Sequence, residues 1–204
     1  MDGVQITFVN QSNDMNNSSV VIFQKNVATN FDELAVAWRV IENCGRGWTH
    51  EFVYPMQFQV GARDSWGNMS NLEYAVNGQS WAVDESPSGS SLSLTAQASS
   101  SSTEVEVRNL LNVGSTDACI FRDGRLLACK TGVSPQQKAV FEFKPTIWVG
   151  VVSQIEEGEF INSAILSSVN QSFSLLGLNK AQLILTGGGS GPNAQPYKFT
   201  LVPQ

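Results

Sequence analysis

The stretch SGSSLSLTAQASSSSTEVEVRN, residues 88–109, indicates β-structure more plainly than any other part of the chain. Leucines and alanines alternate with Ser, Thr and Gln in its first half, and valines alternate with charged residues in its second half. Such alternation places successive side chains on opposite faces of a strand, so each half predicts one half-buried strand. The four serines 99–102 between the halves predict a hairpin loop.

The two predicted strands have a register that gathers the apolar side chains on one face. With the loop at 99–102, Leu94 faces Val107, whereas Thr95 meets Glu106 on the other face. Membrane-inserting hairpins need this pattern, because one face of each strand contacts lipid and the other contacts water. An ordinary sheet with one solvated face has the same pattern, so both interpretations are open. The residues of the candidate membrane hairpin are Leu92, Leu94, Ala96, Ala98, Val105 and Val107.

Similar short runs fill the rest of the chain, divided by Gly, Asn, Ser and Pro. Residues 31–41 fit a helix or a strand, and their β neighbours favour a strand. The tetrapeptide VNQS occurs at 9–12 and at 169–172, but the flanks do not align and no repeat is predicted. We predict an all-β protein, an antiparallel β-sandwich of the jelly-roll or Greek-key type with about a dozen short strands and little or no helix. The length of 204 residues fits a single all-β domain over 1–204.

The composition limits the partners that the protein can have. Only 15% of the residues are charged, and 24 Ser and 16 Asn supply a neutral polarity that is common in proteins that bind sugars, self-assemble or act outside cells. Nucleic acid is not an expected partner, because the net charge is -6 and the cations are scattered singly. No stretch has the length of a transmembrane helix, and residues 1–10 lack a Sec signal. We expect synthesis in the cytoplasm without a Sec signal, with release to act extracellularly as one alternative.

Two of the three cysteines flank a predicted hairpin. The pair Asp123-Gly124 predicts a two-residue turn. In the resulting register Cys119 faces Ala128 and Cys129 faces Ala118, so the two thiols point to opposite faces. We therefore expect free thiols in a reducing compartment rather than a disulfide.

The inventory of reactive side chains argues against an enzyme. His50 is the only histidine, and Cys44 lies six residues before it without a surrounding catalytic motif. The glycine-rich segment 186–196 lacks the lysine and the helix of a phosphate-binding loop. The cysteines have no metal-type spacing, and the acidic segment 156–159 fits a solvated turn first and a calcium-binding loop second. We predict no catalytic residues, no metal and no cofactor.

Three tryptophans lie in or beside predicted loops among polar residues. An indole ring in a loop stacks on a sugar or enters a membrane interface, and the alternative role is to cap one end of the sandwich. The ligand-binding candidates are Trp48, Trp66, Trp81, Arg46, Arg63 and Asn68.

The sequence favours a non-catalytic β-sandwich protein that interacts with a cell surface or a membrane, with a small bacterial pore-forming or insecticidal-type toxin as one form. A lectin-like carbohydrate-binding module and a self-assembling structural protein are the alternatives. The expected partners are a membrane or a cell-surface glycan, and a homo-oligomer is possible.

Overall fold

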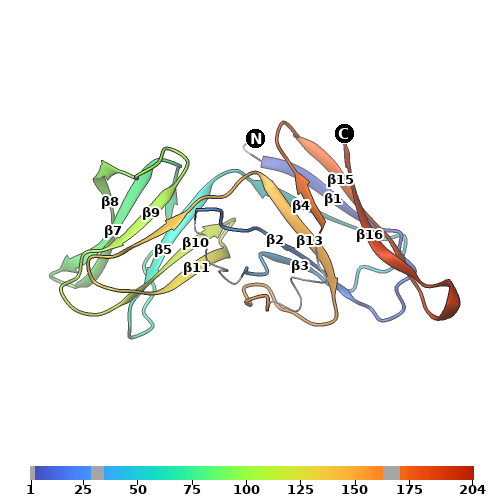
Figure 1. The fold of residues 1–204 in the computed structure, drawn as a ribbon, viewed down its shortest axis with the longest axis horizontal. Helices are drawn as coiled ribbons and strands as arrows, with labels where there is room; N and C mark the ends of the chain where they lie inside the picture. Colours follow the sequence, from blue (N-terminus) through green and yellow to red (C-terminus); the bar gives the residue numbers. More distant parts are fainter. Residues whose placement is uncertain (1–2, 29–34, 163–170) are drawn as a thin grey trace. The chain divides into compact units, whose positions relative to one another are not determined.

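The computed structural model describes residues 3–28, 35–162 and 171–204 (Figure 1). These ranges contain sixteen β-strands, one short 3-10 helix (Gly191–Asn193) and no α-helix. The predicted all-β sandwich class is confirmed, with more strands than the dozen expected. No helix among the described residues has the length and apolarity to span a bilayer.

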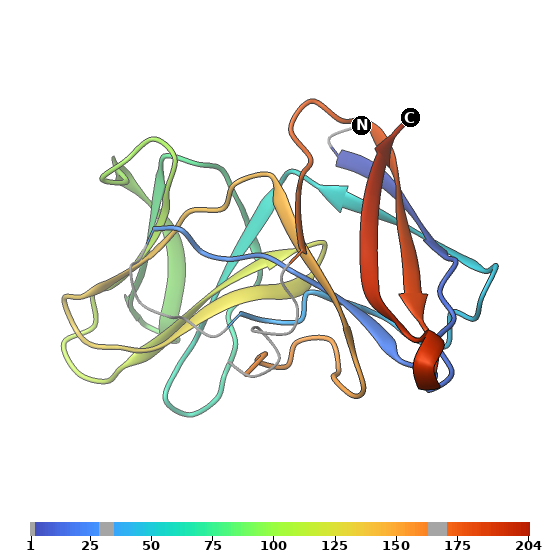
Figure 2. The ribbon, with the colours of Figure 1, turned by 45° about the vertical axis from the view of Figure 1, so that its right-hand side comes forward.

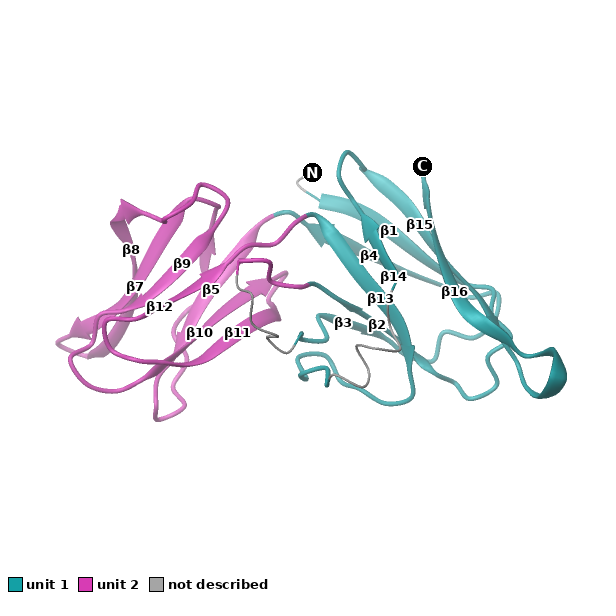
Figure 3. Ribbon diagram, in the orientation of Figure 1, with its two compact units in different colours: residues 1–24, 34–56, 145–204 teal, residues 25–33, 57–144 magenta. Residues whose placement is uncertain are grey.

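The strands form four sheets that belong to two compact units (Figure 3). Unit 1 comprises residues 1–24, 34–56 and 145–204, and unit 2 comprises residues 25–33 and 57–144. These units are defined by backbone contacts, and the single domain expected over 1–204 stays a prediction.

Each unit holds two four-stranded sheets. In unit 1 one sheet has the order β16-β15-β1-β4 and the other β14-β13-β2-β3. The bounds are β1 Gly3–Asn10, β2 Ser19–Phe23, β3 Arg39–Ile41, β4 Thr49–Pro55, β13 Thr146–Val152, β14 Gln171–Ser174, β15 Lys180–Gly188 and β16 Gln195–Pro203. In unit 2 the orders are β11-β10-β5-β6 and β12-β9-β7-β8. The bounds are β5 Phe58–Arg63, β6 Glu73–Ala75, β7 Gln79–Ser86, β8 Gly89–Ala98, β9 Val105–Asn109, β10 Thr116–Arg122, β11 Arg125–Val133 and β12 Lys138–Phe141.

The two units have the same strand topology. β1 pairs in parallel with β15 and antiparallel with β4, as β9 pairs with β7 and β12 (Figure 2 shows the blue β1 beside the orange β15). In the second sheets, β2 lies between β13 and β3 as β10 lies between β5 and β11. The residue pairing in these sheets also agrees. Val21 on β2 pairs with Gly150 on β13, and Cys119 on β10 pairs in the same way with Gly61 on β5. The strands β1–β4 therefore correspond to β9–β12, and β5–β8 correspond to β13–β16.

The chain is thus a structural repeat whose halves exchange partners. The first repeat is β1–β8 and the second is β9–β16, but β1–β4 pair with β13–β16 while β5–β8 pair with β9–β12. The VNQS tetrapeptide does not mark this repeat, because residues 9–10 lie in β1 and residues 171–172 lie in β14, which are not equivalent strands. The sequence conceals the repeat because equivalent positions share little more than hydrophobic character, as in Ile22-Phe23 and Ile120-Phe121.

Aromatic packing closes the core of unit 1. Trp38 is fully buried, and its ring lies 6.2 Å from that of Phe52 and 5.7 Å from that of Tyr54 on the opposite sheet. The strand β2 is buried along its whole length, which explains its unbroken apolar sequence SVVIF. Of the ambiguous segment 31–41, residues 31–34 lie outside the described residues, and the rest forms a bridge at Val36 and then β3. The preference for a strand there is confirmed for Arg39–Ile41, and Val36 forms only an isolated bridge.

The cysteine prediction is wrong, because a β-bulge changes the register. Next to the turn the pairing is as expected, with Phe121 opposite Leu126, but one extra residue on β11 then places Ile120 opposite Ala128. Cys119 consequently faces Cys129, and the two form a disulfide. A one-residue shift moves every later side chain to the other face, so a single bulge reverses the conclusion drawn from the regular register.

The hairpin predicted over residues 88–109 is also wrong. The two-residue connection Pro87-Ser88 joins β8 to β7, and β7 lies between β8 and β9. Trp81 on β7 pairs with Leu94 on one side and with Val107 on the other. The predicted faces nevertheless hold, because residues paired across strands share a face. β7 takes the central position because its Trp-Ala-Val core is buried, whereas β8 is largely exposed.

Candidate functional site

An ordered loop in unit 2 presents the most exposed tryptophan of the chain. This Trp66 loop (residues 64–70) connects β5 to β6 and begins where Arg63 bridges to Met69. The backbone N–H of Asp64 donates to the carbonyl of Asn68 at 3.0 Å, and the N–H of Gly67 donates back to the carbonyl of Asp64 at 3.1 Å. Gly67 has φ +88°, a conformation that glycine adopts without the penalty of a side chain.

The carboxylate of Asp64 holds the loop in shape. One oxygen accepts the backbone N–H of Trp66 at 2.9 Å and that of Asn68 at 2.8 Å, and the other accepts the side-chain amide of Asn68 at 2.9 Å. The Asn68 amide and these backbone N–H groups hold the pKa of Asp64 below its ordinary value of 3.8. The loop therefore keeps an ionised, fully engaged carboxylate at neutral pH.

Trp66 itself is 88% exposed at the tip of this loop. An indole in this position offers a flat apolar face on which a ligand can stack, with a polar N–H at its edge. The order of the loop matters, because a preordered ring loses little conformational freedom when a ligand stacks on it.

A small cleft with both polar and apolar lining residues lies between the Trp66 loop and the start of β8, and Trp66 itself does not line it. Its volume is about 80 Å³, well below the ~300–1,000 Å³ of pockets that enclose a small molecule. It is lined by Ala62, Arg63, Asp64, Asn68, Met69, Ser70, Val83, Ser90, Ser91, Leu92 and Thr116. A cleft of this size accepts part of a ligand that rests mainly on the surface.

Arg63 is positioned at this cleft by an ion pair. Its Nε and Nη2 both donate to one carboxylate oxygen of Asp117, at 3.0 and 2.6 Å. Half of the arginine side chain remains exposed. Its remaining Nη1 has no partner within the part of the chain that the structure describes, so it is free to donate to a ligand.

The six predicted ligand-binding residues do not form one site. Arg63, Trp66 and Asn68 come together in the Trp66 loop of unit 2. Arg46 and Trp48 lie in unit 1, in the connection between β3 and β4, where Arg46 donates to the side-chain oxygen of Asn13 at 2.7 Å and Trp48 is 70% exposed.

Trp81 cannot contribute a surface for stacking. It lies on the core face of β7 and is 6% exposed, so the short strand expected there is present but its tryptophan faces the core. Asp64, Ser90 and Ser91 line the cleft but were not among the ligand-binding residues predicted from the sequence. The pattern DSWGN contains the signal for Asp64, because aspartate followed by a Gly turn favours side-chain bonds to the next N–H groups.

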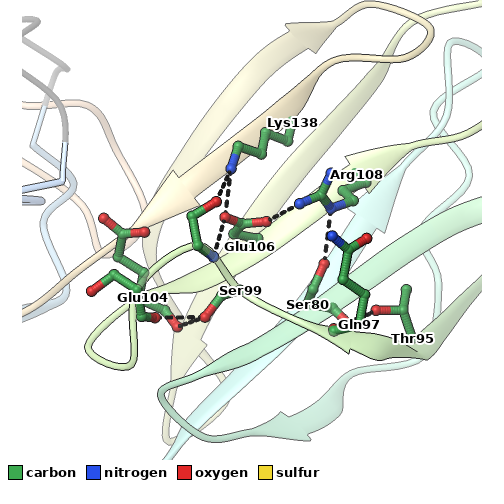
Figure 4. A network of polar contacts seen from close by, with 10 residues as sticks. Ser80, Thr95, Gln97, Ser99, Glu104, Glu106, Arg108 and Lys138 are labelled. Carbon is green, nitrogen blue, oxygen red and sulfur yellow. Dashed lines mark hydrogen bonds and ion pairs between the residues drawn. The ribbon is translucent and has the colours of Figure 1, made fainter.

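A second polar cluster covers the other face of the sheet that contains β8 (Figure 4). The side chain of Glu106 on β9 is fully buried, and it accepts from Lys138 Nζ at 2.5 Å and from Arg108 Nη2 at 2.6 Å. The backbone N–H of Ser100 donates to it at 2.8 Å, so the serine-rich loop 99–102 folds over the carboxylate. Arg108 Nε also donates to the hydroxyl of Ser80 at 3.1 Å.

These neighbours keep the carboxylate of Glu106 ionised. Burial acts to raise its pKa, but the hydrogen bonds from Lys138 and Ser100 and the charge of Lys138 prevail, and the pKa falls from 4.5 to about 2. All its partners belong to the protein, so we assign this cluster to stability rather than to ligand binding.

The predicted membrane-hairpin residues differ widely in exposure. Val105 and Val107 are buried in the core of unit 2, whereas Ala96 and Ala98 are exposed and Leu94 is 50% exposed. Leu92 is half-buried and lines the cleft. Their role in a membrane stays a prediction.

The remaining candidates concern catalysis and metals. Burial raises the pKa of the Cys44 thiol, and burial and the charge of Arg39 lower the pKa of His50, although Glu157 opposes the latter shift. Both shifts favour the neutral forms over a thiolate–imidazolium pair. Within residues 3–28, 35–162 and 171–204 there is no group of three or more His, Cys, Asp or Glu side chains that could hold a metal ion. No protein family model, curated protein or solved structure matches this chain.

Proposed function

We propose that the protein is a non-catalytic carbohydrate-binding protein that recognises a cell-surface glycan through the Trp66 loop. The observation that carries this proposal is the 88% exposure of Trp66 on a loop that the Asp64 carboxylate locks in place. An ordered, exposed indole on the same loop as a small cleft with polar lining groups provides both parts of a sugar site: an apolar face for stacking, and hydrogen-bonding groups for orientation.

The groups around Trp66 suit a pyranose ring. The C–H face of the sugar stacks on the indole, while its hydroxyls reach the cleft. Arg63 Nη1 is a donor there, and the hydroxyls of Ser90 and Ser91 both donate and accept. The small cleft volume favours a terminal or internal sugar of an exposed glycan over a fully enclosed monosaccharide.

The disulfide supports an action outside the reducing cytoplasm. Disulfides form and persist mainly in oxidising environments, and Cys119–Cys129 links neighbouring strands of unit 2. This observation favours the extracellular alternative for localisation over the reducing compartment expected from the sequence.

Membrane insertion by residues 88–109 ranks behind sugar binding. To form a hairpin, β8 and β9 would both have to leave β7, and Glu106 would lose Lys138 on β12. Separating a buried ion pair typically costs ~3–5 kcal/mol. A receptor or a low pH would have to supply that free energy.

The test is a glycan array probed with the wild type and two variants. We expect Trp66→Ala to weaken binding of the recognised glycan at least about tenfold, which corresponds to ~1.4 kcal/mol of binding free energy. Trp48→Ala is the matched control, because it removes the other exposed loop indole and should leave binding unchanged. No glycan bound by the wild type, or equal binding by Trp66→Ala, would refute the proposal.

A further inference from the structure

The eight edge strands of the four sheets differ in how well they resist pairing with another strand. The edges are β16 and β4, β14 and β3, β11 and β6, and β12 and β8. Four of these have only three or four residues: β3, β6, β12 and β14. β4 contains Glu51 and Pro55, and β11 contains Arg125, Lys130 and a bulge. Short edges, charges, prolines and bulges are the usual protections against edge-to-edge association.

β8 lacks most of these protections. It is the longest strand, with ten residues, and its sequence GSSLSLTAQA has no charge and no proline. One irregularity lies between Leu94 and Ala98, but the segment Gly89–Leu94 pairs regularly with β7. Apart from these bonds to β7, the backbone of Gly89–Leu94 has one further hydrogen bond among the described residues, from the Ser86 hydroxyl to the Gly89 carbonyl.

The internal repeat provides a built-in comparison. β16 holds the same topological position in unit 1 that β8 holds in unit 2. β16 carries Pro196, Lys198 and Pro203 along its nine residues. The equivalent edge in unit 2 has none of these residue types, so the open edge is not a general property of this topology.

We propose that two copies of this chain associate through their β8 strands, paired antiparallel over Ser90–Leu94 so that Leu92 of one copy faces Leu92 of the other. A second copy offers no other edge that is both long and unprotected within its described residues, so the partner of β8 is β8 itself. A two-fold axis makes such an interface self-complementary. Uncharged strands can face each other without repulsion, whereas a charged edge strand resists such pairing.

Light scattering coupled to size exclusion tests this pairing at about 100 µM, where small and weak interfaces are populated. The wild type should show about twice the monomer mass of 22.1 kDa. Ser93→Lys and, independently, Leu94→Lys should reduce it to the monomer mass, because a lysine on an edge strand opposes pairing with another strand. Thr200→Lys on the exposed edge of β16 is the matched control and should leave the dimer intact.

Far-UV circular dichroism confirms that each variant is folded, and two independent variants guard against one that fails to fold. A monomeric wild type would overturn the proposal, because the edge of β8 would then not pair with a second copy of the chain. A dimer that survives both β8 variants, or that Thr200→Lys disrupts equally, would also overturn it.

Discussion

Replacing Glu106 by glutamine removes the charge that holds the outer face of the β12-β9-β7-β8 sheet together. Glutamine keeps nearly the same shape but cannot form ion pairs with Lys138 and Arg108. The lowered pKa gives the size of the effect, because a group that is more acidic in the folded state stabilises that state when ionised. The difference between 4.5 and about 2 corresponds to roughly 3 kcal/mol at pH 7.

The sign of the pH dependence follows from the same shift. Because the pKa is depressed in the folded state, the stabilisation is complete above the unfolded value of 4.5 and is lost as the pH falls towards 2. At pH 3 about half of it, roughly 1.5 kcal/mol, should remain. The Glu106→Gln deficit should therefore shrink between pH 7 and pH 3.

Urea unfolding of the wild type and the variant, followed by circular dichroism from pH 7 to pH 3, measures this deficit. Glu104→Gln is the matched control, since Glu104 is two residues away and only partly buried. Its effect should stay within about 0.5 kcal/mol. A deficit that does not change with pH, or that does not exceed the control, would refute the electrostatic reasoning.

Three further predictions concern the fold. Replacing Cys119 and Cys129 by serine should lower the free energy of unfolding by about 3 kcal/mol, given their separation of ten residues, and thiol titration of the denatured, unreduced wild type should detect one free thiol rather than three. Cleavage at a protease site inserted at 99–102 should yield two fragments that co-elute under native conditions and separate only in denaturant, because each unit contains strands from both fragments. Fragments that separate under native conditions would contradict this exchange of strands between the two repeats. Gly187→Ala should lower the melting temperature more than Gly47→Ala. Both glycines have a positive φ, but only a Cβ at Gly187 would lie 2.1 Å from a facing carbonyl oxygen, that of Pro196, so equal shifts would contradict this close approach.

The sequence predicted local features better than pairing. Alternation correctly assigned Leu94 and Val107 to one face, because the face of a side chain depends only on its own strand. The partner of a strand depends on distant residues, so the insertion of β7 between β8 and β9 was missed. The bulge that aligns Cys119 with Cys129 likewise leaves no mark in a regular pattern.

The candidate site was predictable in part for the same reason. Arg63, Trp66 and Asn68 lie within six positions of each other, and the local turn chemistry of DSWGN brings them together. Ser90 and Ser91 reach the same cleft only because β8 follows β7 at the edge of the facing sheet. Trp81 was expected at the start of a short strand beside a loop, and its burial arises from the strands on both sides of β7, which the sequence does not show.

The most direct test of the carbohydrate site is a nitrogen-15 spectrum of the five tryptophan indoles during titration with methyl glycosides of N-acetylglucosamine, galactose and mannose. The Trp66 signal, assigned by its loss in Trp66→Phe, should shift with at least one glycoside, while the signal of the buried Trp81 stays fixed. Shifts confined to Trp48, or none with any of the glycosides, would contradict a sugar site at the Trp66 loop.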